Sequence, residues 1–493
     1  MSEAASTVLG VERSAGGRRW RSREGDARLG LTLAQRHGLP EVVGRIMAAR
    51  GIGLEDAAVW LDPTLKALLP DPSQLKDMDR AADRIADAVR SGETIAIFGD
   101  YDVDGATSTA LLLRFLRSVE GLVATYIPDR MTEGYGPNAP ALLSLRQRGA
   151  AVAVTVDCGI TAFEPLETAA EAGLDVVVVD HHVAEPRLPR AHSVVNPNRL
   201  DDDSGHGQMA AVGVTFLLAV AVNRALRDAG WYAGRPEPDL RQWLDLVALG
   251  TVCDVVPLTG VNRAFVAQGL KVMAQRGNPG IAALADIARM GEAPEAWHAG
   301  FLLGPRVNAG GRVGEAGLGA ALLSASDYAT ALPIAQRLDA WNSERKEIEA
   351  ACLEEAIALV EASDLHDGLV YAASEGWHPG VIGIVAGRLK ERYNRPACVV
   401  ALADGSGRGS GRSVSGVDLG SAVIAARQQG LLVNGGGHAM AAGFTVSADR
   451  QADFRAFLAE RIMAQTGGAG PVAELGLTAR CSRAAPPWNW RRR

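Results

Sequence analysis

Three aspartates, Asp100, Asp102 and Asp104, lie two residues apart in the stretch TIAIFGDYDVDGATS (94–108). The apolar run before them has the length and β-branched character of a buried strand, and helical periodicity resumes after Gly105. Like charges this close repel one another, so the fold must offset them. A bound divalent metal would do so. The alternative is a solvated acidic turn between a strand and a helix.

Further carboxylates and histidines follow other apolar runs. AVAVTV leads into Asp157, DVVVV leads into Asp180-His181-His182, and GTVC leads into Asp254. Ligands of parallel α/β sheets bind at the carboxyl ends of the strands, where we expect these side chains to meet. A mixed set of Asp and His suits two closely spaced divalent ions. Taken singly, Asp157 could cap a helix and the histidine pair could lie in a surface turn, but the repeated placement favours a metal site.

The elements that must position these residues alternate between strand and helix from about residue 94 to residue 254. This alternation predicts an α/β fold with parallel strands joined by crossover helices. We expect strands at 95–98, 123–127, 151–156 and 176–179. We expect helices at 106–119, 139–148 and 162–172, and a strongly helical region at 211–250. Every acidic motif, Asp254 included, is then expected at the end of a strand.

The whole chain is expected to fall into six segments. These are a disordered segment at 1–35, a helical leader at 36–92, an α/β catalytic domain at 93–325, a connecting helix at 326–366, a smaller α/β domain at 367–465 and an irregular tail at 466–493. The helix has no Gly or Pro after Pro333, which favours a rigid span between two domains. In the smaller domain, DGSGRGSGRSVSG and NGGGHAMAAG are interpreted as Gly-rich loops.

Composition constrains the partners and the compartment. The 493 residues include 50 Lys and Arg against 57 Asp and Glu, a net charge of −7, so no overall basic field attracts nucleic acid. Local basic clusters and bound cations could still hold a polyanion. The five cysteines are scattered and form no C-x-x-C pair, which fits a reducing cytosol. The sequence contains no signal-peptide core and no run of eighteen apolar residues, so we expect a soluble cytoplasmic protein without membrane contact.

Several motifs together resemble a known family. GDYDVDGATS, VTVDCGI, VVVVDHH and GTVCDVVPL resemble the four successive motifs of the DHH phosphoesterase superfamily, and GRSVSG and GGGHAMAAGF resemble its DHHA1 domain. PDRMTEGYGPN, LLGPRVNAGGR, the helical leader and the helix with WNSERKEIE are similar to the RecJ group of bacterial single-strand-specific DNA exonucleases. The resemblance spans roughly residues 35–465. It implies a DHH domain with a mainly parallel sheet, a long connecting helix and a smaller α/β DHHA1 domain.

Members of this superfamily hydrolyse phosphodiesters with two Mn²⁺ or Mg²⁺ ions. The resemblance therefore also implies a set of metal ligands in this chain. The matching positions are Asp100, Asp102, Asp104, Asp157, His181, His182 and Asp254. Asp157 is a candidate to bridge both ions, and His182 could orient or protonate instead of binding metal. Asp102, Asp157 and His182 are the residues expected to take part directly in catalysis.

Loops rich in arginine or glycine are candidates for substrate contact. A bidentate guanidinium or a glycine-lined backbone suits a phosphate, although each such segment could also be an ordinary surface arginine or turn. A cleft between the two domains would admit one strand and exclude a duplex. The candidate residues are Arg130, Arg306, Asn308, Arg312, Arg412, Ser413, Gly436 and His438.

The implied activity is 5′→3′ exonuclease action on single-stranded DNA in DNA repair and recombination. A helicase and a single-strand-binding protein are possible partners, and a monomer is expected. The alternatives are a nanoRNase or cyclic-dinucleotide phosphodiesterase of the same superfamily, and a non-catalytic DNA-binding scaffold, which would be expected to lose metal ligands. The segment PVAELGLTARCSRAAPPWNWRRR does not resemble the OB-type domain that usually follows DHHA1 in RecJ, so reduced affinity for long strands is expected.

Overall fold

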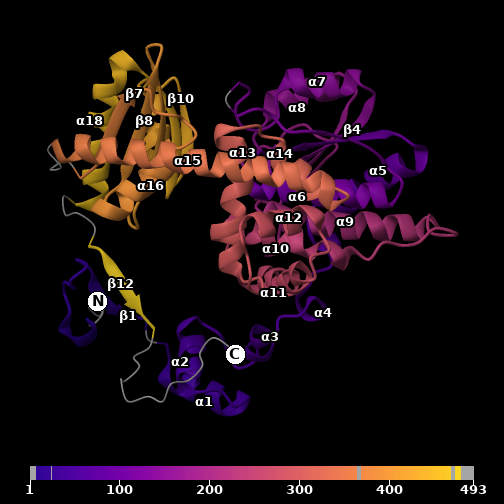
Figure 1. Cartoon of the computed structure of the whole chain (residues 1–493), viewed down its shortest axis with the longest axis horizontal. Coiled ribbons are helices and arrows are strands. Elements are labelled where there is room, and N and C mark those ends of the chain that lie inside the picture. Colours follow the sequence, from indigo (N-terminus) through magenta and orange to yellow (C-terminus); the bar gives the residue numbers. More distant parts are fainter. Residues whose placement is uncertain (1–6, 24, 131, 363–367, 468–471, 479–493) are drawn as a thin grey trace. The chain divides into compact units, whose positions relative to one another are not determined.

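The computed structural model describes residues 7–23, 25–130, 132–362, 368–467 and 472–478. The chain divides into two compact units. Residues 62–345 form the central unit, and residues 1–61 together with 346–493 form the terminal unit. Figure 1 shows the helices and strands of both units.

The central unit is built on a five-stranded sheet whose strands all run parallel, in the order β3-β2-β4-β5-β6. The strands are β2 (Thr94–Gly99), β3 (Leu122–Tyr126), β4 (Ala150–Val156), β5 (Asp175–Val179) and β6 (Ser193–Val195). The chain passes from β2 to the edge strand β3 and then crosses back to β4. The strand order therefore reverses between β2 and β4, and ligands of such sheets bind in the crevice beyond the strand ends at this reversal.

Helices cover both faces of this sheet. On one face lie α5 (Met78–Ser91), α6 (Val103–Ser118) and α9 (Ala211–Asp228), and on the other lie α7 (Ala139–Gln147) and α8 (Phe163–Glu171). Alternate residues of β2 enter the two cores: Ile95 and Ile97 the first, Ala96 and Phe98 the second. The four predicted strands and their three crossover helices are confirmed, whereas the short strand β6 was not predicted.

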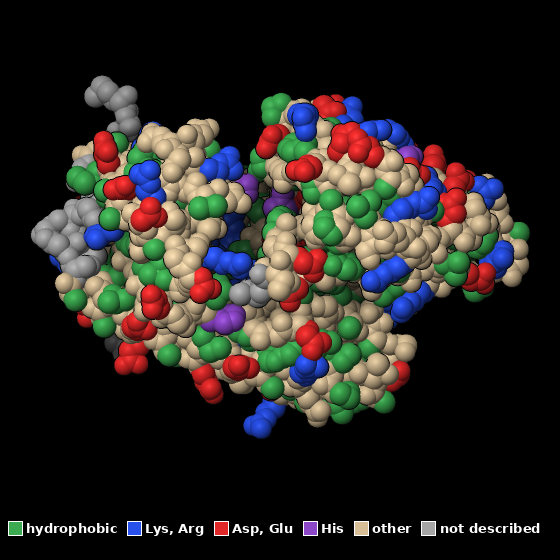
Figure 2. All heavy atoms as spheres, turned by 90° about the horizontal axis from the view of Figure 1, so that it is seen from above, with side chains coloured by type: hydrophobic (Ala, Val, Ile, Leu, Met, Phe, Trp, Pro, Cys, Tyr) green, Lys and Arg blue, Asp and Glu red, His purple; other side chains and the backbone are tan. Residues whose placement is uncertain are grey.

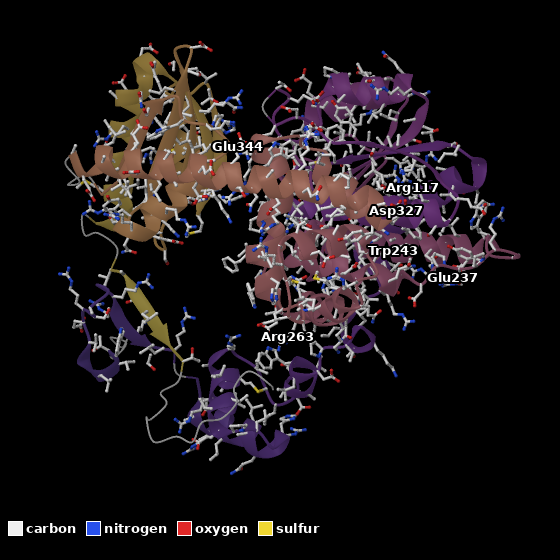
Figure 3. All side chains as sticks on the ribbon, in the orientation of Figure 1. Arg117, Glu237, Trp243, Arg263, Asp327 and Glu344 are labelled. Atoms are coloured by element: carbon white, nitrogen blue, oxygen red, sulfur yellow. The ribbon has the colours of Figure 1, made fainter. Side chains whose placement is uncertain are left out.

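A largely helical region follows the sheet. It contains η3 (Leu240–Trp243), α10 (Leu244–Cys253), α11 (Gly260–Ala274), α12 (Pro279–Ile287), the π-helix η4 (His298–Leu303), α13 (Gly304–Val313) and α14 (Leu318–Ser324). Trp243, labelled in Figure 3, packs against Phe115 of α6 with ring centroids 6.3 Å apart. The expectation that Asp254 ends a strand is wrong. The apolar run before it is the buried helix α10, and Asp254 is the residue that caps its carboxyl end.

The predicted connecting helix is observed as α15 (Tyr328–Ala362), a helix of 35 residues. Asp327, labelled at its start in Figure 3, accepts a hydrogen bond from the backbone N–H of Thr330 at 2.8 Å. The boundary between the two units falls within this helix, between Arg345 and Lys346. The end of the expected segment, residues 363–366, lies outside the described residues.

The terminal unit contains a mixed five-stranded sheet in the order β10-β11-β9-β8-β7. Only β7 and β8 pair in parallel, and the remaining pairs are antiparallel. The strands are β7 (Val370–Glu375), β8 (Ala397–Ala403), β9 (Ser406–Arg412), β10 (Asn434–His438) and β11 (Ala441–Ser447). The helices packed on this sheet are α16 (Ile382–Tyr393), α17 (Leu419–Gln428) and α18 (Gln451–Thr466).

The two Gly-rich segments of this unit are strands, so their interpretation as loops is wrong. In β9 glycine alternates with Ser or Arg, and the glycines occupy the buried positions. A Cβ atom on Gly409 would lie 2.0 Å from the ring of Phe444 on β11, and one on Gly411 would lie 2.6 Å from Leu419. The neighbouring side chains therefore fill the space that glycine leaves, a stabilisation that a strand's own composition does not reveal.

Both ends of the expected chain organisation need correction. Residues 1–35 were expected to be disordered, but β1 (Arg19–Ser22) pairs in parallel with β12 (Glu474–Leu477), which lies in the expected irregular tail. Backbone bonds from Arg19 to Ala473 and from Arg23 to Leu477 hold the pair. The expected helical leader is also divided: α1 (Ala27–His37), α2 (Glu41–Ala49) and α3 (Ala57–Leu61) belong to the terminal unit, and α5 packs on the central sheet.

The surface carries mixed charge. On the face seen in Figure 2, Lys and Arg side chains are interspersed with Asp and Glu side chains, in keeping with the net charge of −7. Within the described residues, no helix combines the length and the apolar character needed to cross a bilayer.

Candidate metal centre

The three spaced aspartates occupy the turn from β2 into α6. Asp102 is the N-cap of α6 and accepts a hydrogen bond from the Gly105 N–H at 3.0 Å. Asp104, in the first turn of that helix, is 1% exposed and accepts from the first two N–H groups of α9 at 2.7 and 2.9 Å. Gly105 is required here because a Cβ atom would lie 2.6 Å from the carbonyl oxygen of Asp100. The sharp turn thus places all three carboxylates at one end of the sheet.

Asp157 follows β4 in the left-handed region, with φ of 62°. A non-glycine residue in this region is strained, and such strain is often found at functional sites. Its N–H donates to the Val179 carbonyl at 3.0 Å, and the Tyr135 hydroxyl donates to its carbonyl oxygen at 3.0 Å. Helix α8 begins at Phe163 with Ala162 as N-cap. Asp157 therefore does not cap this helix, which removes the structural alternative considered for it.

Asp180 holds the two histidines that follow it. Its carboxylate accepts from the backbone N–H groups of Ile160, His181 and His182 at 3.0, 2.8 and 3.1 Å, and lies 2.7 Å from His182 Nδ1. Burial acts to raise the pKa of Asp180, but the bond to His182 holds it below its usual value. Burial acts to lower the pKa of His182, but Asp180 raises it to about 9. Asp180 was not among the expected ligands, although it begins the predicted triplet.

His181 turns its other ring edge toward the carboxylates. Its Nδ1 lies 3.0 Å from the Met209 carbonyl oxygen, which can only accept, so the Nδ1 carries a proton and donates to it. Its Nε2 lies 3.3 Å from Asp157 Oδ1 and 3.9 Å from Asp104 Oδ2. Asp254, which approaches from α10, lies 3.6 Å from Nδ1. A neutral imidazole with a free Nε2 lone pair is the form that binds metal.

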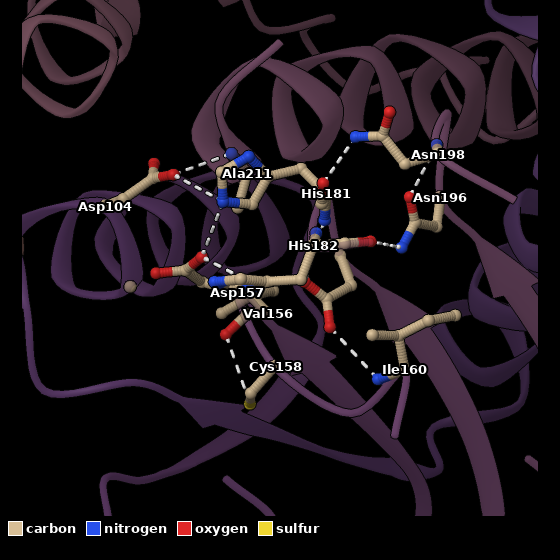
Figure 4. A network of polar contacts seen from close by, with 12 residues as sticks. Asp104, Val156, Asp157, Cys158, Ile160, His181, His182, Asn196, Asn198 and Ala211 are labelled. Carbon is tan, nitrogen blue, oxygen red and sulfur yellow. Dashed lines mark hydrogen bonds and ion pairs between the residues drawn. The ribbon is translucent and has the colours of Figure 1, made fainter. Parts of the chain in front are cut away.

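These side chains form three overlapping triads whose ligand atoms lie within 4.8 Å of one another. The triads are Asp157-His181-His182, Asp104-His181-Asp254 and Asp100-Asp102-Asp157. Asp157 and His181 each belong to two of them. Figure 4 shows Asp104, Asp157 and the two histidines converging on one point beside the strand ends. All seven predicted ligand positions are thus brought together in these three triads.

The electrostatics of the cluster also fit cations. Burial, followed by the neighbouring carboxylates, raises the pKa of Asp104 to about 7 and that of Asp254 to about 7, and places the pKa values of Asp100 and Asp157 well above the usual range. Among the described residues, Asp100 Oδ1, Asp157 Oδ1 and His181 Nε2 have no hydrogen-bond partner. Buried acceptors without donors and mutually repelling carboxylates are what bound divalent ions would satisfy.

Two of the predicted phosphate contacts lie near this cluster. The Arg130 guanidinium is 5.2 Å from the centre of the ring of Tyr101, the residue that follows Asp100. Its positive charge acts to lower the pKa of the Asp100 carboxyl. The positive charge of Arg312 on α13 acts to lower the pKa of the Tyr101 hydroxyl. The GPRVNAGGR segment is helix α13 and not the expected loop. Its glycines permit close packing: a Cβ atom on Gly311 would lie 2.8 Å from the Tyr101 carbonyl oxygen.

Arg306 and Asn308 lie on the same helix and are half-buried. Arg306 forms an ion pair with Asp339 of α15 at 2.8 Å and donates to the Leu302 carbonyl at 2.7 Å. Its side chain therefore joins two helices of the central unit. The loop interpretation did not foresee this structural role.

The predicted contacts of the terminal unit lie at one end of its sheet. Arg412 on β9 and His438 on β10 both stand beside Ala441 of β11, and Gly436 lies two residues before His438. Ser413 is 1% exposed, and its hydroxyl donates to the Val417 carbonyl at 2.7 Å. This hydroxyl stabilises a turn, so the expectation that it binds substrate is not supported by its contacts.

Comparisons with known proteins agree with this geometry. Residues 94–251 match the DHH family, N-terminal domain, and residues 366–464 match the DHHA1 domain. The chain is 39% identical over 477 residues to the single-stranded-DNA-specific exonuclease RecJ of Dickeya dadantii and 38% identical over 476 residues to that of Escherichia coli. Each alignment covers 92% of this chain and 82% of the relative.

Two solved structures of RecJ exonucleases are also similar to this chain. The crystal structure of RecJ in complex with Mn²⁺ from Thermus thermophilus matches with a TM-score of 0.77 and 31% identity, over 92% of this chain and 62% of that chain. A crystal structure of exonuclease RecJ bound to manganese matches with a TM-score of 0.67 and 34% identity, over 81% of this chain and 96% of that one. The chain therefore belongs to the RecJ family of DHH/DHHA1 proteins.

Proposed function

We propose that this protein is a metal-dependent exonuclease that hydrolyses the phosphodiester bonds of single-stranded DNA from the 5′ end, with two Mn²⁺ or Mg²⁺ ions. The observation that carries the proposal is the cluster of three overlapping Asp and His triads at the switch point of the parallel sheet. The metal cluster supports phosphodiester hydrolysis in general. Single-stranded DNA is proposed as the substrate because the relatives are single-stranded-DNA-specific exonucleases.

The ligands would be the predicted seven. Asp157, whose carboxylate has two oxygens, would contribute to both ions, whereas His181 would bind one ion through Nε2. When bound, the two ions supply the Lewis-acid charge that activates a water molecule and stabilises the phosphate oxygens. Asp180 fixes the ring orientation of His182 through Nδ1 at 2.7 Å. That bond leaves Nε2 of His182 as the ring atom that can bind a metal ion.

The arginines would hold the substrate. Arg130 and Arg312 lie beside Tyr101 and offer guanidinium groups to a phosphate. The DNA strand would also be contacted by residues at one end of the mixed sheet in the terminal unit, namely Arg412, Gly436 and His438. Asn308 is a further candidate on α13, whereas Arg306 would act through the α13–α15 contact.

The cellular setting belongs to the same proposal. A monomer in the cytoplasm would take part in DNA repair and recombination, with a helicase and a single-strand-binding protein as partners. The four described cysteines, Cys158, Cys253, Cys352 and Cys398, are all unpaired, as a reducing compartment requires.

The test is product analysis on long single strands labelled at the 5′ or the 3′ end, with Mn²⁺, with Mg²⁺ and with chelator. We expect mononucleotides released from the 5′ end, no action on a blunt duplex, and no activity with chelator. Asp157→Ala should abolish cleavage, and Asp239→Ala, which changes an exposed carboxylate paired with Arg241, should not. Unchanged cleavage by Asp157→Ala, or preferential hydrolysis of dinucleotides, would refute the proposal.

A further inference from the structure

Two asparagines after β6 hold the backbone of the histidine pair. Asn196 is fully buried, and its Nδ2 donates to the His182 carbonyl at 2.9 Å while its Oδ1 accepts from the Asn198 N–H at 2.7 Å. Asn198 Nδ2 donates to the His181 carbonyl at 2.5 Å and to the Gly207 carbonyl at 3.0 Å. Figure 4 shows both carboxamides directed at the histidine backbone from the side opposite Asp104.

Gly207, the second partner of Asn198, is the first residue of a segment, residues 207–212, whose backbone contacts two of the predicted metal ligands, His181 and Asp104. The Met209 carbonyl fixes the His181 ring at Nδ1, and the first two N–H groups of α9 bind Asp104. Asn198 therefore ties the backbone of His181 to the segment that orients the ring of His181. Any shift of this segment would move His181 and Asp104 together.

A third asparagine contacts the same segment from another element, α11. Asn262 of α11 is fully buried, and its Nδ2 donates to the Gln208 carbonyl at 2.7 Å and to the Pro257 carbonyl at 3.0 Å. Pro257 lies three residues after Asp254. Asn262 thus links the segment at 207–212 to the chain that delivers Asp254.

We propose that Asn196, Asn198 and Asn262 are positioning residues that preorganise the metal ligands by holding their backbone. The choice of carboxamide has a physical reason. The buried carbonyls need donors, and an amide supplies them without adding charge. An Arg or Lys donor at these points would place a fixed positive charge beside a site that must attract cations. Partners of metal ligands commonly contribute about 10- to 100-fold to metal affinity.

The proposal rests on the metal centre proposed above, and its test is a Mn²⁺ titration in which free Mn²⁺ is measured by its electron paramagnetic resonance. Asn196→Asp is the sharpest variant, because it keeps the size and the Oδ1 acceptor but replaces the donor by an oxygen facing the His182 carbonyl. We expect its apparent Kd for Mn²⁺ to rise about 10- to 100-fold.

Asn223→Asp is the matched control. Asn223 is 4% exposed, its Nδ2 donates to Glu237 at 2.7 Å, and it lies on α9 three turns beyond the segment at 207–212. The same chemical change there should lower the melting temperature but leave Mn²⁺ affinity within about twofold. Equal melting-temperature losses with different Mn²⁺ affinities would separate positioning from general stability.

Three outcomes would overturn the inference. If Asn196→Asp binds Mn²⁺ as tightly as the unmodified chain, the asparagines only stabilise the fold. If Asn196→Asp does not fold, the same titration is carried out on Asn198→Asp, a change at a less buried position. Unchanged Mn²⁺ affinity of that variant would overturn the inference. Failure of the unmodified chain to bind Mn²⁺ would instead overturn the metal centre itself, and the inference with it.

Discussion

Asp245 offers a test of the buried electrostatics that is independent of catalysis. It lies in the first turn of α10 and is 1% exposed. Its Oδ1 accepts from the Leu246 N–H at 2.8 Å, and among the described residues its Oδ2 has no hydrogen-bond partner. Arg114 attracts it, but the guanidinium donates to the carbonyls of Leu323 and Ala325. Burial therefore prevails and raises the pKa of Asp245 to about 6.

The sign and size of the effect follow from this shift. The ordinary pKa of an aspartate is 3.8, so the folded chain holds the proton more tightly than the unfolded chain. The resulting penalty on folding grows as the pH rises above 3.8 and is complete above about pH 6. A shift of about two units corresponds to about 3 kcal/mol. Asn imitates the protonated form and keeps the Oδ1 acceptor, so Asp245→Asn should recover most of this free energy at pH 7.5.

Thermal unfolding at two pH values measures the effect. At about 2 °C per kcal/mol for a unit of this size, Asp245→Asn should raise the melting temperature by about 4–6 °C at pH 7.5. At pH 4.5 the gain should shrink to under about 2 °C, because the folded carboxyl is then protonated. Asp239→Asn is the control: the hydrogen bond from Arg241 lowers the pKa of Asp239, so this change should not stabilise at pH 7.5. An equal gain at both pH values, or a loss at pH 7.5, would refute the charge argument.

Three further predictions concern the site and its support. Asp180→Asn should lower the pKa of His182 from about 9 and reduce cleavage about 10- to 100-fold, measured as initial rate; an unchanged rate would contradict the orienting role. Mn²⁺ at 100 times its Kd should stabilise the protein by about 2.7 kcal/mol in thermal unfolding, and Asp157→Ala should lose this gain. A double-mutant cycle of Arg306→Ala and Asp339→Ala should give a coupling energy of about 1 kcal/mol, and zero coupling would argue against the α13–α15 ion pair.

The parallel sheet and its acidic strand ends could be predicted because the pattern is local. Buried parallel strands are continuous apolar runs, and Asp100 and Asp157 directly follow two of them. Asp254 shows where this reasoning fails. The run LDLVALGTVC before it is buried on all sides, so it has neither the two-residue period of a strand nor the apolar stripe of a surface helix. Residues 244–250 of this run fall in the region predicted to be helical, and the continuation of that helix through GTVC was the signal that could have decided.

Other features have no local signal. The glycines of β9 suggest a loop until Phe444 from another strand is seen to fill their place. The support given by Asn196 and Asn198 is equally hidden, because an asparagine beside a proline is typical of a turn. Only the folded backbone of the histidine pair shows what their carboxamides bind. Residues that bind metal could thus be found by type and spacing, whereas residues that hold the ligands in place could not.

The pairing of β1 with β12 has a consequence for synthesis on the ribosome. Arg19 lies opposite Glu474, so β1 emerges about 20–90 s before its partner at about 5–20 residues per second. The central unit is continuous in sequence, and all of its residues are made within that interval. During this time β1 presents unpaired backbone groups, which other strands could bind. The short length and the three polar residues of RWRS limit this risk until Glu474–Leu477 is delivered.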